Sequence, residues 1–284
     1  KLFGRRSWRH YPYRALLPHQ FVRHIFSINR PLKKINIIGN EIYTNEELLD
    51  GFELSEGSFF SFLSNDNQYS REKLKGDIET LESFYRDRGY LKFSIESSQI
   101  SLSRDKKLIF ITFNVNEGEK YTINDVDVVG EIPFDEDVYI DIVNRLKDTT
   151  YSQAQITSIE EFFTNVLGNR GYAFAEVVGN PEINEATNEV KLIFSVQPGN
   201  RTYTRKILFT GNDITQDYVL RREMRQFEGA WSSDNSIEAG KVRLERLGYF
   251  KEVNVETIPV PGTDDQVDIV YSVEEETTGS LGGN

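Results

Sequence analysis

The stretch KILFTGNDIT, residues 206–215, closely repeats KINIIGNEIYT at residues 34–44. A turn motif also recurs, as RDRGYLKF (86–93), GNRGYAFAEV (168–177) and ERLGYFKEV (245–253). Runs of alternating apolar residues close each copy, as LIFITFNVNEG (108–118), VKLIFSVQPG (190–199) and VDIVYSVEE (267–275). Self-similarity at a fixed period is the signature of a repeat architecture. The chain is therefore predicted to be three copies of a unit of roughly 80 residues, an ordinary length for a small domain.

The copies differ in two places. The middle copy has a degenerate opening, NDVDVVGEIPF (124–134), where the others have an Ile or Phe strand followed by Gly-Asn. The first copy is longer between its opening and its turn motif, and we assign the extra residues to an insertion at GSFFSFLSNDNQ (57–68).

Each copy predicts the same order of elements. It opens with a short β-rich strand that ends in glycine, which suits a turn with positive φ. In the first copy, Thr44 and Glu47 form a capping-box pattern that starts a helix. Leu74, Ile78 and Leu81 then recur at helical spacing and predict the apolar stripe of a second, longer helix.

Gly89, Gly171 and Gly248 stand where a glycine in the left-handed conformation ends a helix. We expect the tyrosine after each glycine to start the next strand as a half-buried residue, and a turn then leads to the final alternating strand. The order β-α-α-β-β predicts an α+β fold in which a three-stranded mixed sheet is covered by two helices.

Composition limits the class of protein. The 284 residues are 38% hydrophobic, contain no cysteine, and include no apolar run of the roughly 18 residues that a membrane helix needs. The net charge is −12, although residues 1–31 hold seven Lys or Arg, three His and no carboxylate. A strongly acidic body argues against nucleic-acid binding, which needs basic surface. Nucleic acid is therefore not an expected partner.

Three longer stretches carry a resemblance to a known family: DIETLESFYRDRGY (77–90), VLRREMRQFEGAW (219–231) and RLGYFKEVNVET (246–257). With the glycine motifs above, they resemble the POTRA domains of the BamA family, central subunits of the outer-membrane β-barrel assembly machine of Gram-negative bacteria. The resemblance covers about residues 33–284 and points to the third, fourth and fifth POTRA domains of that family.

The resemblance implies domain boundaries. Residues 32–118, 119–199 and 200–275 correspond to the three POTRA domains, and residues 276–284 to the start of a transmembrane barrel. Residues 1–31 do not resemble the family. They are open to three interpretations: an expression scar, a non-homologous replacement, or a basic and aromatic segment that lies on a membrane surface.

The function that the resemblance implies is that of a scaffold at the periplasmic face of the outer membrane. Such modules receive unfolded β-barrel precursors and dock the lipoproteins BamB and BamD; further implied partners are periplasmic chaperones and the barrel of the same protein. Catalysis needs a positioned nucleophile, base or metal, and His10, His19 and His24 all lie in segment 1–31. We therefore predict no enzymatic activity, no cofactor and no metal site.

Two other functions stay open. POTRA modules also occur in two-partner secretion transporters, which are expected to carry two such units where this chain has three. A hydrolase that uses acidic residues would require paired carboxylates with strongly shifted pKa values in one cleft.

The first candidate docking site lies in the last repeat. The resemblance implies that Glu223, with Arg222 and Arg225 beside it, contacts BamD. The alternative is an ordinary ion pair within the helix, worth a few tenths of a kcal/mol. These side chains should be partly exposed, and Glu223→Lys should weaken lipoprotein binding while leaving the melting temperature nearly unchanged. The predicted buried stripe of this helix is Val219, Leu220, Met224 and Phe227.

The second candidate site is the strand predicted at residues 93–102, which the element order places at an edge of its sheet. The resemblance implies that BamB docks here, on Ile95, Glu96, Ile100 and Leu102. Alternatively, the three apolar residues pack inward. The Ser-Ser pair at 97–98 predicts a β-bulge, a common device for re-aiming side chains at an edge.

Overall fold

The computed structural model describes residues 32–52, 67–104 and 108–276. The basic segment 1–31, most of the expected insertion 57–68 and residues 277–284 lie outside the described residues. The chain divides into two compact units, of which the first, residues 1–119, holds the first repeat, and the second, residues 120–284, holds the other two.

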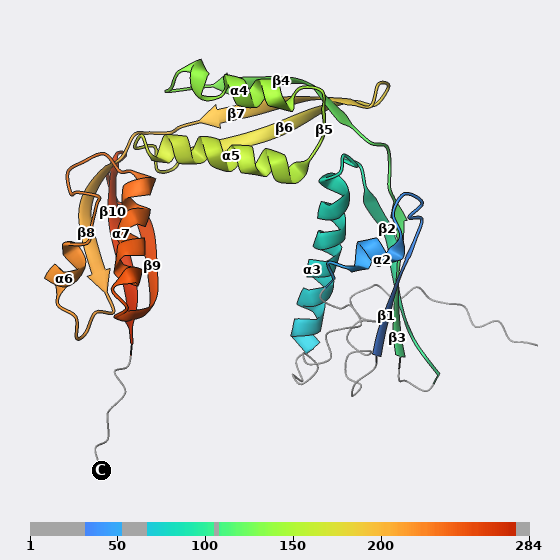
Figure 1. Cartoon of the computed structure of the whole chain (residues 1–284), viewed down its shortest axis with the longest axis horizontal. Helices are drawn as coiled ribbons and strands as arrows, with labels where there is room; N and C mark the ends of the chain where they lie inside the picture. The colour runs from blue at the N-terminus through green and yellow to red at the C-terminus, as the bar shows by residue number, and fades with distance from the viewer. Residues whose placement is uncertain (1–31, 53–66, 105–107, 277–284) are drawn as a thin grey trace, which may run out of the picture. The chain divides into compact units, whose positions relative to one another are not determined.

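The first repeat has the predicted order of elements (Figure 1). They are β1 (Leu32–Ile38), α2 (Asn45–Leu49), α3 (Asn67–Arg86), β2 (Ser94–Leu102) and β3 (Leu108–Asn116). The last strand, β3, lies at the centre of the sheet, where it pairs in parallel with β1 and antiparallel with β2. The sheet is thus mixed and three-stranded, and β1 and β2 form its two edges.

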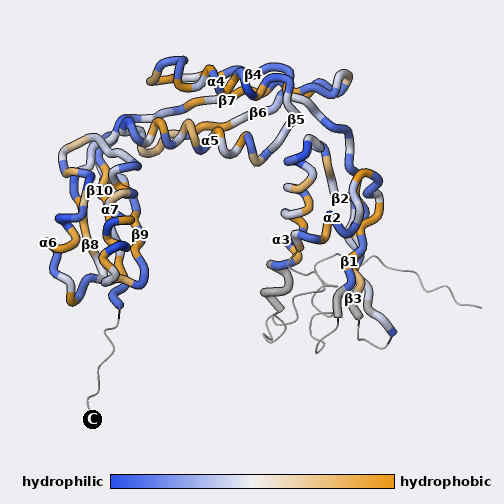
Figure 2. Tube along the Cα trace, viewed as in Figure 1, coloured by the Kyte–Doolittle hydropathy of each residue, from blue (hydrophilic) through white to orange (hydrophobic). Residues whose placement is uncertain are grey.

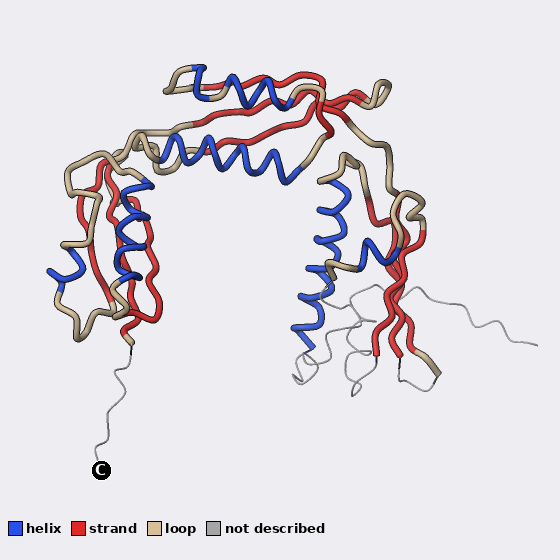
Figure 3. Tube along the Cα trace, in the orientation of Figure 1, coloured by secondary structure: helices blue, strands red, loops and turns tan. Residues whose placement is uncertain are grey.

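The second and third repeats follow the same plan (Figure 3). The second consists of β4 (Thr122–Gly130), the 3-10 turn η2 (Glu136–Val138), α4 (Ile140–Leu146), β5 (Thr149–Thr150), α5 (Gln153–Gly168), β6 (Glu176–Asn184) and β7 (Glu189–Gln197). The third consists of β8 (Tyr203–Thr210), α6 (Asp217–Arg221), α7 (Asp234–Arg246), β9 (Phe250–Pro259) and β10 (Gln266–Glu275).

The α+β fold class and the β-α-α-β-β order are therefore confirmed, with one correction. The sheet of the middle repeat has four strands in the order β5-β4-β7-β6, because the two residues of β5 pair with the start of β4. The third sheet has the predicted three strands, in the order β8-β10-β9.

The opening glycines have the predicted positive φ, and the packing gives a second reason for them. Gly39, Gly130 and Gly211 have φ of 96°, 107° and 83°. At each position a Cβ atom would collide with a backbone carbonyl oxygen of the neighbouring central strand. The turn therefore requires glycine both for its backbone conformation and for the close approach of the two chains.

The helix boundaries agree with the caps predicted for the first repeat. Thr44 is the N-cap of α2 and forms the full capping box with Glu47. Gly89 has φ of 99° after α3, as expected for a glycine that ends a helix. The tyrosines precede their strands rather than start them, since β2, β6 and β9 begin at Ser94, Glu176 and Phe250. Only Tyr172 is half-buried as expected, whereas Tyr90 is buried in the core and Tyr249 is exposed.

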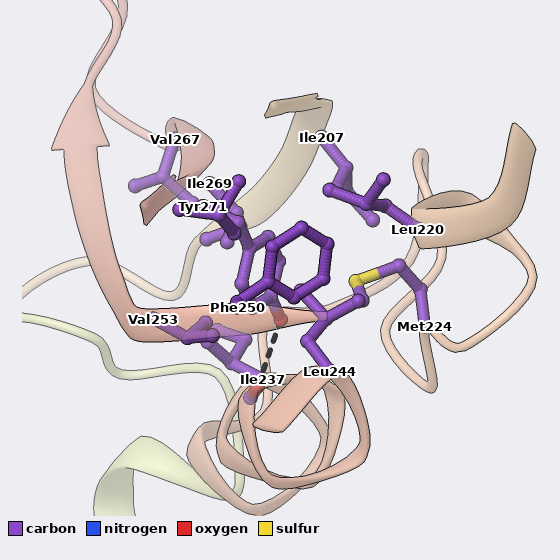
Figure 4. Close-up of a cluster of buried hydrophobic side chains, with 11 residues drawn as sticks. Ile207, Leu220, Met224, Ile237, Leu244, Phe250, Val253, Val267, Ile269 and Tyr271 are labelled. Carbon is purple, nitrogen blue, oxygen red and sulfur yellow. Dashed lines mark hydrogen bonds between the residues drawn. The ribbon is translucent and has the colours of Figure 1, made fainter. Parts of the chain in front are cut away.

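Each repeat has its own core of buried apolar residues from its sheet and its helices, and apolar residues recur along both kinds of element in each repeat (Figure 2). In the first repeat, Tyr85 of α3 is fully buried and stacks on Phe93 with ring centroids 4.1 Å apart. In the third repeat, the fully buried Tyr271 lies among the side chains shown in Figure 4, and its hydroxyl donates to the carbonyl oxygen of Ile237 at 2.7 Å.

A carboxylate at the end of the central strand holds the loop after the opening glycine. Glu117 accepts hydrogen bonds from the backbone N–H groups of Glu41 and Ile42 and from the Tyr85 hydroxyl. Glu275 accepts from the N–H groups of Ile214 and Thr215 in the same way. The middle repeat has Pro198 at this position, so this tie is specific to the first and third repeats.

Polar contacts join the second repeat to the third within the second unit. The N–H and the hydroxyl of Thr202 both donate to the carbonyl oxygen of Gly171, at 2.7 and 2.9 Å. The backbone N–H of Asn235, at the start of α7, donates to Oδ1 of Asn169, at the end of α5, at 2.8 Å. Next to it the carboxylate of Asp234 lies against the bare Cα of Gly168, and burial raises its pKa.

Candidate docking surfaces

Strand β2 lies at a free edge of its sheet. It pairs with β3 on one side, and within the described residues it has no strand neighbour on the other. The prediction that this segment is an edge strand is confirmed. An edge strand presents unpaired backbone N–H and C=O groups to which another chain can add.

A β-bulge interrupts β2, as predicted, although it lies earlier in the strand than expected. The register shifts between Ile95 and Ser97, so Glu96 is the extra residue and the Ser-Ser pair follows it. Beyond the bulge, Ile100 stands opposite Ile111, and before it Ile95 stands opposite Val115. Both partners belong to the buried core. The bulge therefore keeps the apolar residues of β2 on one face of the sheet.

The four candidate BamB-docking residues consequently have different settings. Ile95 and Ile100 are half-buried and pack against the core of the first repeat, whereas Glu96 is exposed at the bulge. Leu102 ends the strand opposite Ile109, and its side chain lies outside the described residues. The polar residues of β2 are exposed, namely Ser94, Ser97, Ser98, Gln99 and Ser101. What β2 presents to solvent is thus its backbone edge and short polar side chains.

Glu223 lies in the turn after α6 rather than on a continuous helix, because α6 ends at Arg221. Its side chain is only 14% exposed. One carboxylate oxygen accepts a hydrogen bond from Nη2 of Arg243 on α7 at 2.7 Å, and the other lies 3.4 Å from Nε of Arg222. Arg222 and Arg225 are exposed, as predicted. Glu223 therefore connects the turn to the long helix of the repeat.

The predicted buried stripe of this segment is wrong at its last member. Leu220 and Met224 are buried in the core, but Phe227 is 70% exposed. The loop departs from the helix because Gln226, which is buried, donates to the backbone carbonyls of Phe227 and Trp231 and accepts from the N–H of Ser233. With Tyr218, which is 67% exposed on α6, Phe227 gives this segment two apolar side chains in solvent.

Sequence reasoning missed three participants in this region. Arg243 lies 20 residues after Glu223, so no helical spacing relates the two. The exposed Tyr218 and Phe227 fit the apolar positions of a helix, and a helical pattern alone does not show that α6 ends after five residues. The buried amide of Gln226 is the signal that separates a loop from a continued helix here.

A cavity of about 460 Å³ in the first repeat bears on the hydrolase hypothesis. Its walls include Glu46, Glu47 and Asp50 of the α2 region. Glu47 is the capping-box partner of Thr44, and hydrogen bonds from the backbone and the side chain of Thr44 lower its pKa. A carboxyl that donates a proton in catalysis needs the opposite shift. The guanidinium of Arg88 covers the aromatic wall, 3.5 Å above the ring of Phe84.

Within the described ranges no group of three or more His, Cys, Asp or Glu side chains is arranged to hold a metal ion. The helices of those ranges include none that is long and apolar enough to cross a membrane.

Comparisons with known proteins agree with this architecture. Outer membrane protein assembly factor BamA of Neisseria meningitidis serogroup B is 33% identical over 250 residues, which are 87% of this chain and 31% of that protein. The factor of the same name from Buchnera aphidicola is 32% identical over 250 residues, covering 88% of this chain and 40% of its own length. The chain thus spans well under half the length of these relatives.

A solved structure of Haemophilus influenzae BamA POTRA3-5 superposes with a TM-score of 0.75 at 28% identity, covering 87% of this chain and 96% of that one. BamA of Haemophilus ducreyi lacking POTRA domains 1-3 gives a TM-score of 0.50 at 39% identity over 55% of this chain and 30% of that one. Residues 31–118, 121–199 and 202–276 each match the family described as "POTRA: Surface antigen variable number repeat". With three consecutive matches on three β-α-α-β-β units, the chain belongs to the POTRA family.

Proposed function

We propose that the chain is a periplasmic scaffold for the assembly of outer-membrane proteins, where it receives unfolded β-barrel precursors and docks accessory lipoproteins. The named relatives are outer-membrane protein assembly factors. Similarity to this group supports a location at the periplasmic face of the outer membrane, where the POTRA domains would act as scaffold modules. Further proposed partners are periplasmic chaperones and the barrel of the same protein.

The number of repeats favours assembly over the alternative of two-partner secretion. Three tandem units match the POTRA family, whereas a two-partner secretion transporter is expected to carry two. The similarity to POTRA3-5 of an assembly factor also covers nearly the whole of that solved chain.

The free edge of β2 is the observation that carries the proposal. A partner strand that adds to it gains main-chain hydrogen bonds of about 0.5–1.5 kcal/mol each. Main-chain recognition depends little on the sequence of the partner, which suits precursors that share β-structure and differ in sequence. We assign the BamB-type lipoprotein to the same edge, with the exposed Glu96 at the bulge as a polar contact. Ile95 and Ile100 then support the strand from its core side.

The segment around Glu223 is the proposed docking surface for the BamD-type lipoprotein. Exposed arginines and aromatic side chains are enriched among residues that dominate binding energy at interfaces. Arg222 and Arg225 supply the former and Tyr218 and Phe227 the latter. Glu223 keeps one carboxylate oxygen beside the exposed Arg222, so a partner arginine can approach it from the solvent side.

The test is a pair of proline variants in β2, Ser98→Pro and Gln99→Pro. Successive residues of a strand direct their N–H groups to opposite sides. One variant therefore removes an N–H that bonds β3, and the other removes an N–H at the free edge. The edge variant should keep the urea midpoint of the parent chain while its affinity for a purified BamB-type lipoprotein falls about tenfold, or ~1.4 kcal/mol.

Glu96→Lys tests the same edge without a change of backbone. It should weaken binding of the BamB-type lipoprotein and leave binding of the BamD-type lipoprotein unchanged. If the stable proline variant and Glu96→Lys both bind the BamB-type lipoprotein as tightly as the parent does, β2 is not its docking edge.

A further inference from the structure

The edge strand of the middle repeat, β6, differs from β2 in the groups that face its free side. Strand β6 lies at one end of its sheet, and among the described residues its only strand partner is β7. Helix α5 runs along β6 (Figure 1), and Glu160 of this helix accepts a hydrogen bond from the backbone N–H of Gly179 at 2.6 Å. The same carboxylate oxygen is the group that an incoming strand would have to displace to bond this N–H.

The direction of the Gly179 N–H identifies which backbone groups face outward. Since this N–H bonds a side chain of α5 and not β7, it points to the free side of the strand. Residues two apart in a strand share this direction, so Val177, Pro181 and Ile183 face the same way. Pro181 has no N–H at all, and proline occurs in sheets where the N–H would face solvent. Two of four outward donor positions are thus lost to an incoming strand.

The absence of a side chain at residue 179 permits this arrangement. A Cβ atom there would lie 2.7 Å from Cγ2 of Ile156 and 3.3 Å from Oε1 of Glu160, both on α5. Any larger residue would push the helix off the strand and carry the carboxylate away from the amide. The glycine, the proline and the glutamate therefore act on the same edge.

We propose that Glu160 is a selectivity residue that closes the β6 edge to strand addition. Edge strands are templates for pairing with other chains, and proteins that avoid such pairing place prolines or charged groups on them or cover them with a helix. Strand β2, with the sequence SIESSQISL, has neither proline nor glycine, and its one charged side chain, Glu96, lies at the bulge. In consequence an extended partner meets an open edge on the first repeat and a closed one on the second.

This inference concerns a different strand from the proposed lipoprotein edge and holds whatever binds to β2. Backbone amides of β2 report on the proposed function, and amides of β6 report on the closed edge. A single experiment that follows both sets of amides can therefore show whether the proposed function or the closed-edge proposal fails.

The experiment uses the 284-residue chain and, as probe, a synthetic nonapeptide with the sequence of β7, EVKLIFSVQ, which pairs with β6 in the native sheet. Binding is followed by NMR chemical shifts of the Val177, Gly179 and Ile183 amides. Glu160→Ala should accelerate hydrogen exchange at Gly179 and tighten binding of the peptide at β6 about tenfold. Glu161→Ala, which removes the same charge from the exposed neighbouring residue, should change neither.

Two conservative variants separate the hydrogen bond from the charge. Glu160→Gln keeps an acceptor oxygen at the same reach and should stay closed. Glu160→Asp keeps the charge but draws the carboxylate back, and should open the edge even if the alanine variant folds poorly. Equal peptide affinity at β6 in the parent, Glu160→Ala and Glu160→Asp would overturn the proposal, as would an equal gain in Glu161→Ala or in Glu160→Gln.

Discussion

The ion pair between Glu223 and Arg243 makes a prediction that differs from the one drawn from sequence alone. If Glu223 served only as a partner contact, its replacement would leave the stability of the chain nearly unchanged. Its carboxylate, however, is 14% exposed and accepts a charge-assisted hydrogen bond from Arg243 at 2.7 Å. Nε of the same arginine is buried and has no hydrogen-bond partner within the described residues. Loss of the carboxylate would therefore leave Nη2 of Arg243 without its charged acceptor, next to an Nε that already lacks a partner.

The size of the effect follows from these contacts. A hydrogen bond that involves a charged group is worth about 1.5–3 kcal/mol. Because the Arg243 side chain is 40% exposed, solvent screening reduces the pair toward the lower end of that range. We expect Glu223→Ala to lower the free energy of unfolding by about 1–2 kcal/mol, with a coupling energy of about 1 kcal/mol to Arg243→Ala in a double-mutant cycle. Glu223→Lys should cost more, because it places a third cation beside Arg222 and Arg243.

Urea titration followed by tryptophan fluorescence provides the assay. The chain has two tryptophans, Trp8 and Trp231, and Trp8→Phe leaves a single reporter in the third repeat. Trp231 stacks on Tyr203 with ring centroids 3.8 Å apart, so its emission responds when that repeat unfolds. Arg246→Ala, an exposed position at the end of α7, is the matched control and should stay within about 0.5 kcal/mol of the parent.

A coupling energy below about 0.3 kcal/mol would refute the reasoning, since distant and independent sites add to within that error. The same variants also separate stability from docking. Arg243→Ala removes the internal pair but keeps the Glu223 carboxylate. If it weakens binding of the BamD-type lipoprotein as much as Glu223→Lys does, the loss reflects a disturbed fold rather than a lost contact.

Three further predictions follow from the cores and ties. The hydrogen bonds from Thr215 hold the pKa of Glu275 below the usual 4.5. The ionised carboxylate therefore stabilises the fold above pH 4.5, and this contribution is lost as the pH falls through the lowered pKa. Glu275→Gln should remove that part of the acid dependence of the unfolding free energy, measured by urea titrations between pH 6 and about 3. Tyr271→Phe removes the buried hydroxyl hydrogen bond to the carbonyl oxygen of Ile237 and should lower the free energy of unfolding by about 1 kcal/mol, and an unchanged urea midpoint would contradict this. Gly168→Ala places a methyl group on the Asp234 carboxylate and should speed hydrogen exchange at the start of α7. Gly76→Ala, also at a glycine within a helix but with open space around it, is the control and should leave that exchange unchanged.

Much of the fold could be predicted because its signals are local. Positive φ at Gly39 and Gly211 follows from the Gly-Asn turns, and the capping box of Thr44 and Glu47 spans four residues. Repetition then fixes the order of the elements, since a pattern that occurs three times is not accidental. The edge position of β2 follows from that order and needs no side-chain detail.

The parts that were missed depend on long-range contacts. Glu117 bonds to backbone groups about 75 residues earlier in the chain, and a single carboxylate in an acidic sequence gives no sign of that role. The alternation of apolar residues before and after the Ser-Ser pair predicts an irregularity at that pair, but the pairing of β2 with β3 places the extra residue at Glu96. Which edge is covered likewise depends on where α5 lies, as Glu160 shows.

The junction between the second and third repeats has a consequence for how such chains exchange modules. The carbonyl of Gly171 belongs to the second repeat, but both of its donors come from Thr202, which the repeat pattern assigns to the third. Asn169 likewise bonds the backbone of Asn235 inside the next repeat. A recombination event that cuts at residue 200 therefore separates groups that complete one another. A transplant that keeps the second repeat intact must extend past residue 200 to the first turn of α7. The segments that the second and third repeats each need therefore share about 35 residues.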